Sequence, residues 1–273
     1  MRQFDVSLSN RRSTPKSCYV YWRYSAVSSF ILHQQESCGW DFTTDFATMP
    51  SKTRLYFKGS QMPKYERQAY GLKIQQNSHP DIKRIRKATG VPNIHGNKVW
   101  KSSLLVMDYL KEYPPQITRN KKKLKVLEIG CGWGLSGIYC AKVFDAKVTG
   151  LDADETVFPY MEHHAIINDV DVATWKCRYE KVRKADLEAF DLVIGADICF
   201  WDEMVDPLYN LVRRASKVPG LRVVLADPGR PTFTAMAEKC SAKLGAFLEP
   251  WSVPHPENAS GWIMDLDPNW VED

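Results

Sequence analysis

The stretch from Lys125 to Asp152 constrains the fold of this chain more than any other part of the sequence. It reads KVLEIGCGWGLSGIYCAKVFDAKVTGLD, in which a glycine-rich turn and a helical run lie between two short apolar, β-branched segments. We expect strands over Lys125–Ile129 and Lys147–Leu151, and a helix over Leu135–Val143 between them. This strand–turn–helix–strand pattern is typical of one nucleotide-binding half of a parallel α/β fold.

The glycine-rich turn predicts where a ligand binds. It contains Gly130, Gly132, Gly134 and Gly137. Residues without a side chain let the backbone approach a ligand closely, and the helix that follows directs its N-terminus toward it. Asp152 ends the second strand, where its carboxylate can accept hydrogen bonds from both hydroxyls of a ribose. The turn therefore predicts a ligand that contains a nucleoside.

Two cofactors fit this pattern. Gly132, Gly134 and Gly137 match the dinucleotide fingerprint G-x-G-x-x-G, and Asp152 follows Gly132 by 20 residues. Glu128, however, lies two residues before Gly130, where a carboxylate would repel a pyrophosphate and attract the ammonium of a methionine. The run resembles motif I of the class I S-adenosylmethionine-dependent methyltransferases. The resemblance implies S-adenosylmethionine as cofactor, bound by Glu128, Gly130, Cys131, Gly132, Gly134 and Asp152.

The composition predicts a folded, water-soluble protein. Its 273 residues are 44% apolar and 12% aromatic, enough for one large core. No segment approaches the roughly 18 apolar residues of a membrane span. The seven cysteines include no C-x-x-C pair, which predicts reduced thiols in a cytoplasmic compartment. His95, His163 and His164 lack the neighbouring ligands of a metal site, so we expect no metal and expect these histidines to be solvated or on helix surfaces.

The charge is distributed unevenly along the chain. Residues 1–124 carry 22 Lys and Arg against 8 Asp and Glu, a formal charge of +14, and the remainder carries 15 against 24, a formal charge of −9. A basic half beside an acidic half suits an acidic partner, either nucleic acid or a protein surface. A solvated basic face would give the same pattern.

Three regions are expected along the chain. Residues 1–48 are rich in serine and arginine and have no hydrophobic period, so we expect a poorly ordered extension. It is either non-native, with Met49 as the true start, or a presequence for the mitochondrial matrix. Residues 49–120 form a basic accessory segment with a cationic helix over His79–Gly90 and an apolar-faced helix over Asn97–Tyr113. Residues 121–273 are expected to form the methyltransferase domain.

The sequence after Asp152 alternates helices and strands. Strands are expected at 172–178, 190–196 and 221–226, and helices at 155–168, 181–187, 202–216 and 232–244. Two final strands, at 246–253 and 261–266, have only a Pro- and Asn-containing loop between them. A hairpin that closes an alternating sheet is typical of the class I methyltransferase fold. We therefore expect a Rossmann-like α/β fold with a seven-stranded sheet and a basic helical N-terminal extension.

Three short motifs carry a closer resemblance. They are GNKVWKSS at Gly96–Ser103, DICF at Asp197–Phe200 and DPGRP at Asp227–Pro231. Together they resemble the seven-strand protein-lysine methyltransferases, in particular the group that modifies the electron-transfer flavoprotein β subunit and its bacterial relatives. The resemblance implies a protein substrate, with Asp197 and Phe200 as catalytic residues and with Trp100 and Ala196 at the cofactor. Members of this group often carry Tyr at the position of Phe200. Phe200 keeps the aromatic ring of that Tyr and lacks its hydroxyl.

The residues also allow other interpretations. Asp197 could be the N-cap of the helix expected near Asp202, and Trp100 could be a core residue. The basic N-terminal half favours an RNA or small-molecule methyltransferase on the same fold as the second function. A nicotinamide oxidoreductase or a catalytically idle binding module is the third, and Glu128 and the terminal hairpin argue against a dehydrogenase.

Overall fold

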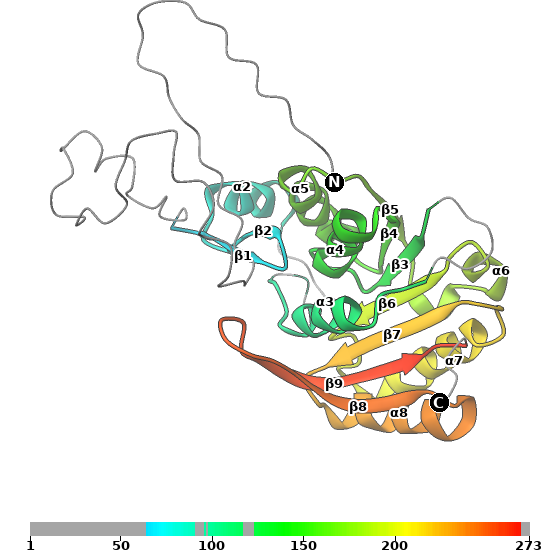
Figure 1. Ribbon diagram of the computed structural model, residues 1–273. Helices are drawn as coiled ribbons and strands as arrows, with labels where there is room; N and C mark the ends of the chain where they lie inside the picture. Colours follow the sequence, from blue (N-terminus) through cyan, green and yellow to red (C-terminus); the bar gives the residue numbers. More distant parts are fainter. Residues whose placement is uncertain (1–63, 91–95, 97, 117–122, 269–273) are drawn as a thin grey trace, which may run out of the picture. The chain divides into compact units, whose positions relative to one another are not determined.

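The computed structural model describes residues 64–90, 96, 98–116 and 123–268 (Figure 1). They all belong to one compact unit, which extends from Ser60 to Asp273. The extension expected at residues 1–48 lies outside the described residues, and the three-region division stays a prediction. None of the helices in the described part of the chain is both long and apolar enough to span a bilayer.

In the described residues, seven strands form one mixed sheet in the order β5-β4-β3-β6-β7-β9-β8. The first five strands in this order are parallel, and β9 runs antiparallel to both β7 and β8. The strands are β3 Lys125–Ile129, β4 Lys147–Asp152, β5 Val172–Lys176, β6 Leu192–Ala196, β7 Arg222–Asp227, β8 Phe247–Val253 and β9 Ala259–Leu266. This topology confirms the Rossmann-like sheet with its terminal hairpin. Chain order reverses at β3, and open α/β sheets bind ligands at such a switch point.

Helices cover both faces of this sheet. The helices are α2 Pro80–Thr89, α3 Ser102–Glu112, α4 Leu135–Phe144, α5 Phe158–Ile167, α6 Lys184–Leu187, α7 Val205–Ala215 and α8 Pro231–Leu244. Val126 packs with α3, α4 and α5 in one core, whereas its neighbour Leu127 packs with α7 and α8 in another. Because both faces of the sheet are covered at its centre, β6 and β7 are buried along almost their whole length, and their apolar runs could be recognised in the sequence.

Short 3-10 turns replace the expected helix starts. They are η2 Glu155–Val157, η3 Tyr179–Lys181 and η4 Asp202–Met204. The helix expected at 155–168 is therefore η2 followed by α5, and the one expected at 202–216 is η4 followed by α7. The expected helix at 181–187 is shorter, because only α6 has helical geometry there.

A β-hairpin in the basic accessory segment was not anticipated by the sequence. It consists of β1 Glu66–Ala69 and β2 Leu72–Gln75, joined through Tyr70 and Gly71 at positive φ of 50° and 76°. Such a two-residue turn requires positive φ at both positions, and Tyr-Gly lacks the Asn-Gly signature that usually reveals it. Strands of four residues carry too little periodicity to be recognised alone.

The hairpin packs on α5 through buried polar groups. The Gln75 N–H donates to His164 Nε2 at 3.3 Å, and Asn168 bonds both backbone groups of Lys73 through its side-chain amide, at 2.8 and 2.9 Å. The expectation that His164 lies on a solvated surface is wrong, because its side chain is fully buried. Burial lowers the pKa of His164 to about 4, so it is a neutral acceptor for the hairpin.

Two polar clusters fix α3 against its neighbours. Asp108 accepts hydrogen bonds from the Tyr70 hydroxyl at 2.8 Å and the Trp251 indole at 2.9 Å, which joins α3 to the β1–β2 hairpin and to β8. Asp265 on β9 accepts the Tyr109 hydroxyl at 2.9 Å and forms an ion pair with Arg222 on β7. The side chains of Arg222 and Asp265 are only 8% and 4% exposed.

Candidate functional site

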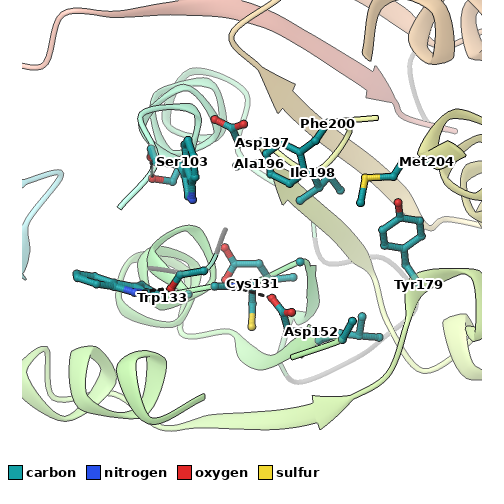
Figure 2. Close-up of a pocket in the computed structure, with 18 of the residues that line it drawn as sticks. Ser103, Cys131, Trp133, Asp152, Tyr179, Ala196, Asp197, Ile198, Phe200 and Met204 are labelled. Carbon is teal, nitrogen blue, oxygen red and sulfur yellow. Dashed lines mark hydrogen bonds between the residues drawn. The ribbon is translucent and has the colours of Figure 1, made fainter. Parts of the chain in front are cut away.

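A cavity of about 240 Å³ lies where the carboxyl ends of β3, β4 and β6 meet (Figure 2). Its wall includes every residue that the sequence selected: Trp100, Glu128, Gly130, Cys131, Gly132, Gly134, Asp152, Ala196, Asp197 and Phe200. Figure 2 shows Trp133, Cys131 and Asp152 on one side of the cavity, and Ser103, Asp197 and Phe200 on the other. Residues predicted from separate motifs are thus brought together in one place.

The glycines of the turn serve two different purposes. Gly132 has a φ of +50°, and a Cβ built on it would have no atom within 4 Å, so its bare backbone borders open space. Gly134 has a φ of +71°, and a Cβ there would lie 2.3 Å from Cγ of Met161. Gly132 is therefore suited to contact with a ligand, whereas Gly134 lets α5 pack closely against the turn.

Glu128 is a buried carboxylate that caps the first turn of α4. Its Oε2 accepts the Gly137 N–H at 2.9 Å, and a Cβ on Gly137 would come within 2.6 Å of this oxygen. Burial raises the pKa of Glu128 to about 8, even though the Gly137 hydrogen bond favours the charged form. A pyrophosphate at this helix N-terminus would meet a carboxylate, which argues against a dinucleotide.

Asp152 lies at the carboxyl end of β4, beside the turn. Its Oδ2 accepts the Gly132 N–H at 3.1 Å and its Oδ1 accepts the Asp154 N–H at 3.0 Å. Burial raises the pKa of this carboxyl above its ordinary value. Each carboxylate oxygen accepts more than one hydrogen bond, so Asp152 keeps acceptor capacity for two ligand hydroxyls.

Asp197 is held by residues of other motifs. Its carboxylate accepts the Ser102 hydroxyl at 3.2 Å and forms an ion pair with Arg230, which also pairs with Asp227 at 2.8 Å. The DICF and DPGRP motifs are therefore joined through one guanidinium. Asp197 has a φ of 63°, outside the helical region. Its interpretation as a helix N-cap is wrong, because Trp201 precedes η4 and Met204 precedes α7 as the capping residues.

Aromatic side chains surround this acidic cluster. The Phe200 ring centroid lies 6.1 Å from that of Trp100 and 5.8 Å from that of Trp201, and the Arg230 guanidinium lies 4.9 Å from the Phe200 ring. Trp100 is half-buried and borders the cavity, so it is not an ordinary core residue. Phe200 uses its ring face toward Arg230, a contact that does not need the hydroxyl of the more frequent Tyr.

Sequence reasoning missed both ends of the cavity. Figure 2 shows Trp133 and Tyr179 at opposite ends, with Cys131 and Asp152 between them. Trp133 donates its indole N–H to the Gly96 carbonyl at 3.0 Å and stacks on Tyr160 with ring centroids 5.2 Å apart. A tryptophan inside a glycine run was a usable signal. Tyr179 lies in a short 3-10 turn with no pattern that marks it.

A family model described as "Lysine methyltransferase" matches residues 80–228. The chain is 29% identical over 140 residues to "Histidine protein methyltransferase 1 homolog" of Dictyostelium discoideum, covering 48% of this chain and 43% of that protein. It is 24% identical over 119 residues to "Electron transfer flavoprotein beta subunit lysine methyltransferase" of Danio rerio, covering 44% of each. The chain thus spans less than half the length of these two relatives.

Among solved structures, the "delta-N METTL16 MTase domain" is similar with a TM-score of 0.47 and 10% identity, over 67% of this chain and 90% of that one. The family match covers the glycine turn, the DICF motif and the start of the DPGRP motif. By this match over more than half of its residues, the chain belongs to the lysine methyltransferase family.

Proposed function

We propose that this chain is an S-adenosylmethionine-dependent methyltransferase that modifies a lysine side chain of a protein. The observation that carries the proposal is the single cavity that all of the residues chosen from separate motifs border. Membership of the lysine methyltransferase family supports the same conclusion. In this proposal the β3–α4 turn binds the cofactor, and the DICF and DPGRP motifs bind the acceptor.

The groups that line the cavity are suited to the proposed cofactor. The bare backbone at Gly132 leaves room beside the turn, Asp152 has acceptor capacity for a ribose, and Glu128 offers a carboxylate to an ammonium. When bound, S-adenosylmethionine supplies an electrophilic methyl group on a positively charged sulfur. The residues of the chain need only hold donor and acceptor in line and exclude water.

The acidic cluster suits a lysine acceptor. Asp197 and Asp227 share the single guanidinium of Arg230, so the three groups carry a net charge of about −1 when all are ionised. This charge attracts an ammonium, and the aromatic side chains of Phe200 and Trp100 border the same cavity. The amine must lose a proton before it accepts a methyl group, and we assign Asp197 the role of orienting it.

Label transfer tests the proposed function. The purified protein is incubated with radiolabelled S-adenosylmethionine and a lysate of its own source, and the label is followed through protease and ribonuclease digestion. We expect label in protein, with methyllysine in the hydrolysate. Label in RNA or in small molecules would overturn the proposal.

Histidine is the second candidate acceptor. The observation that favours it is the similarity to a protein named as a histidine methyltransferase, which is 29% identical over 140 residues. Both acceptors react as neutral nitrogens, so the same cavity is compatible with either. Methylhistidine in place of methyllysine in the labelled protein would select this alternative.

Replacing Asp197 with asparagine is expected to lower methyl transfer by about 100-fold, because a shift of the acceptor of about 1 Å costs that much in rate. The amide cannot form the ion pair with Arg230. Cofactor affinity should stay within about threefold, since Asp152 and the turn are unchanged. Transfer is measured with labelled cofactor, and binding by calorimetry. Asp202→Asn on the exposed η4 is the matched control, and unchanged transfer by Asp197→Asn would contradict the acceptor role.

Cofactor affinity should rise with pH up to about 8, the pKa of Glu128 in the free protein. The pKa of Glu128 is raised by burial to about 8 in the free protein, so at pH 6 the group is protonated. An ammonium partner favours the carboxylate, so binding releases a proton and affinity increases by about tenfold per unit until pH 8. Calorimetry with S-adenosylhomocysteine at pH 6, 7 and 8 measures the change. Glu128→Gln should bind weakly at every pH, and the same pH profile in this variant would disprove the assignment.

A further inference from the structure

The usual anion site of a nucleotide-binding fold is already filled in this protein. A ligand anion in such folds binds at the N-terminus of the helix that follows the first strand. Here Glu128 Oε2 accepts the Gly137 N–H of α4 at 2.9 Å and is itself buried. A ligand carboxylate cannot use the same N–H group, because Glu128 already occupies it. The proposed cofactor has a carboxylate at its amino-acid end, and this group therefore needs a cation elsewhere.

The wall of the cavity offers few cations. Its charged side chains are Lys98, Glu128, Asp152, Arg178, Glu180, Asp197 and Glu203. Arg178 Nε already pairs with Glu180 Oε1 at 2.5 Å. Among the described residues, Lys98 has no carboxylate partner. Its Nζ lies 4.0 Å from the ring centroid of Trp100, a cation–π contact between two residues of the cavity wall.

Lys98 borders the cavity, and the segment that precedes it lies at the Trp133 end. The Trp133 indole binds the Gly96 carbonyl at 3.0 Å, which fixes the segment before Lys98 beside Trp133. The opposite end contains Tyr179 and Met204 (Figure 2), whose side chains offer an apolar surface suited to adenine. With the ribose on Asp152 between these ends, the methionine part extends toward Trp133, Glu128 and Lys98.

We propose that Lys98 binds the carboxylate of the cofactor, while Glu128 binds its ammonium. The inference rests on the proposed function and assigns Lys98 as a specificity-determining residue. It implies that the protein discriminates S-adenosylmethionine and S-adenosylhomocysteine from adenosine thioethers that lack the carboxylate. The lysine charge, and not the length of its stem, makes this discrimination.

Calorimetry with two ligands tests the assignment. The ligands are S-adenosylhomocysteine and its decarboxylated analogue, which keeps the ammonium, the thioether and the adenosine. The full chain should bind the first about tenfold more tightly, the gain of one charge-assisted contact. Lys98→Met keeps the apolar stem and should weaken S-adenosylhomocysteine about tenfold without affecting the analogue. Lys98→Arg should retain the preference.

Lys101→Met is the matched control, because Lys101 is exposed and its Nζ donates to the Asn258 carbonyl at 3.1 Å, away from the cavity wall. It should bind both ligands as the unmodified chain does. If Lys98→Met weakens both ligands equally, or neither, the inference is wrong, and a raised KM for the protein substrate alone would reassign Lys98 to the acceptor. If the unmodified chain binds neither ligand, the proposed function itself fails.

Discussion

Asp152→Ala is expected to weaken the binding of S-adenosylhomocysteine by about 100-fold, because two hydrogen bonds from ribose hydroxyls to a carboxylate are lost together. The substitution also releases the N–H groups of Gly132 and Asp154, which the carboxylate holds at 3.1 and 3.0 Å. Both effects act at the proposed cofactor site, and we expect α4 and the sheet to keep their packing. Isothermal titration calorimetry measures the affinity, and circular dichroism checks the fold.

Two variants make this result interpretable. Glu155→Ala removes an exposed carboxylate three residues further on, which pairs with Lys176 at 2.8 Å outside the cavity, and should leave binding unchanged. Asp152→Asn keeps one acceptor oxygen and should give an intermediate affinity. Full affinity in Asp152→Ala would show that the ribose lies elsewhere.

Arg222→Met is expected to lower the free energy of unfolding by about 3–5 kcal/mol, the cost of leaving a buried charge without its partner. Asp265 would then keep the Tyr109 hydroxyl at 2.9 Å as a donor but lose the guanidinium that neutralises it. The Arg222 contact with the Tyr113 carbonyl at 2.9 Å would be lost as well. Urea unfolding followed by circular dichroism measures the change.

An exposed ion pair serves as the control for the buried pair of Arg222 and Asp265. Lys239 and Asp206 lie 2.7 Å apart with side chains 42% and 74% exposed, and Lys239→Met should leave the free energy of unfolding almost unchanged. The double variant Arg222→Met/Asp265→Leu should regain much of the stability, because no unpaired charge stays buried. A loss below about 1 kcal/mol in Arg222→Met would mean that water reaches the site.

The strands and the glycine turn could be predicted because their signals are local. β3 occupies the predicted Lys125–Ile129, since a buried parallel strand is a continuous apolar run and the following glycines mark its end. Helix starts were less accurate: the chain enters α5 and α7 through 3-10 turns that share the apolar spacing of the helices.

Contacts between distant residues could not be read from the sequence. Asp197 and Arg230 each belong to a recognisable motif, but nothing local shows that they form an ion pair across 33 residues. His164 likewise follows a second histidine in an ordinary helical run, and its burial depends on a hairpin that the sequence did not reveal. Predicting either needs the tertiary packing that places one element on another.

The two clusters that fix α3 determine how much of the chain must be kept for the family motifs to stay folded. The family match ends at residue 228, yet β8 and β9 follow it, and the β1–β2 hairpin precedes its first residue, 80. A fragment trimmed to the match would deprive Asp108 of Tyr70 and Trp251, and Arg222 of Asp265. It would also leave β7 as an open sheet edge, ready to pair with a second chain. The segment that carries the motifs is therefore not an autonomous folding unit. The hairpins on either side of it supply the partners of its buried polar groups and cover the edge of its sheet.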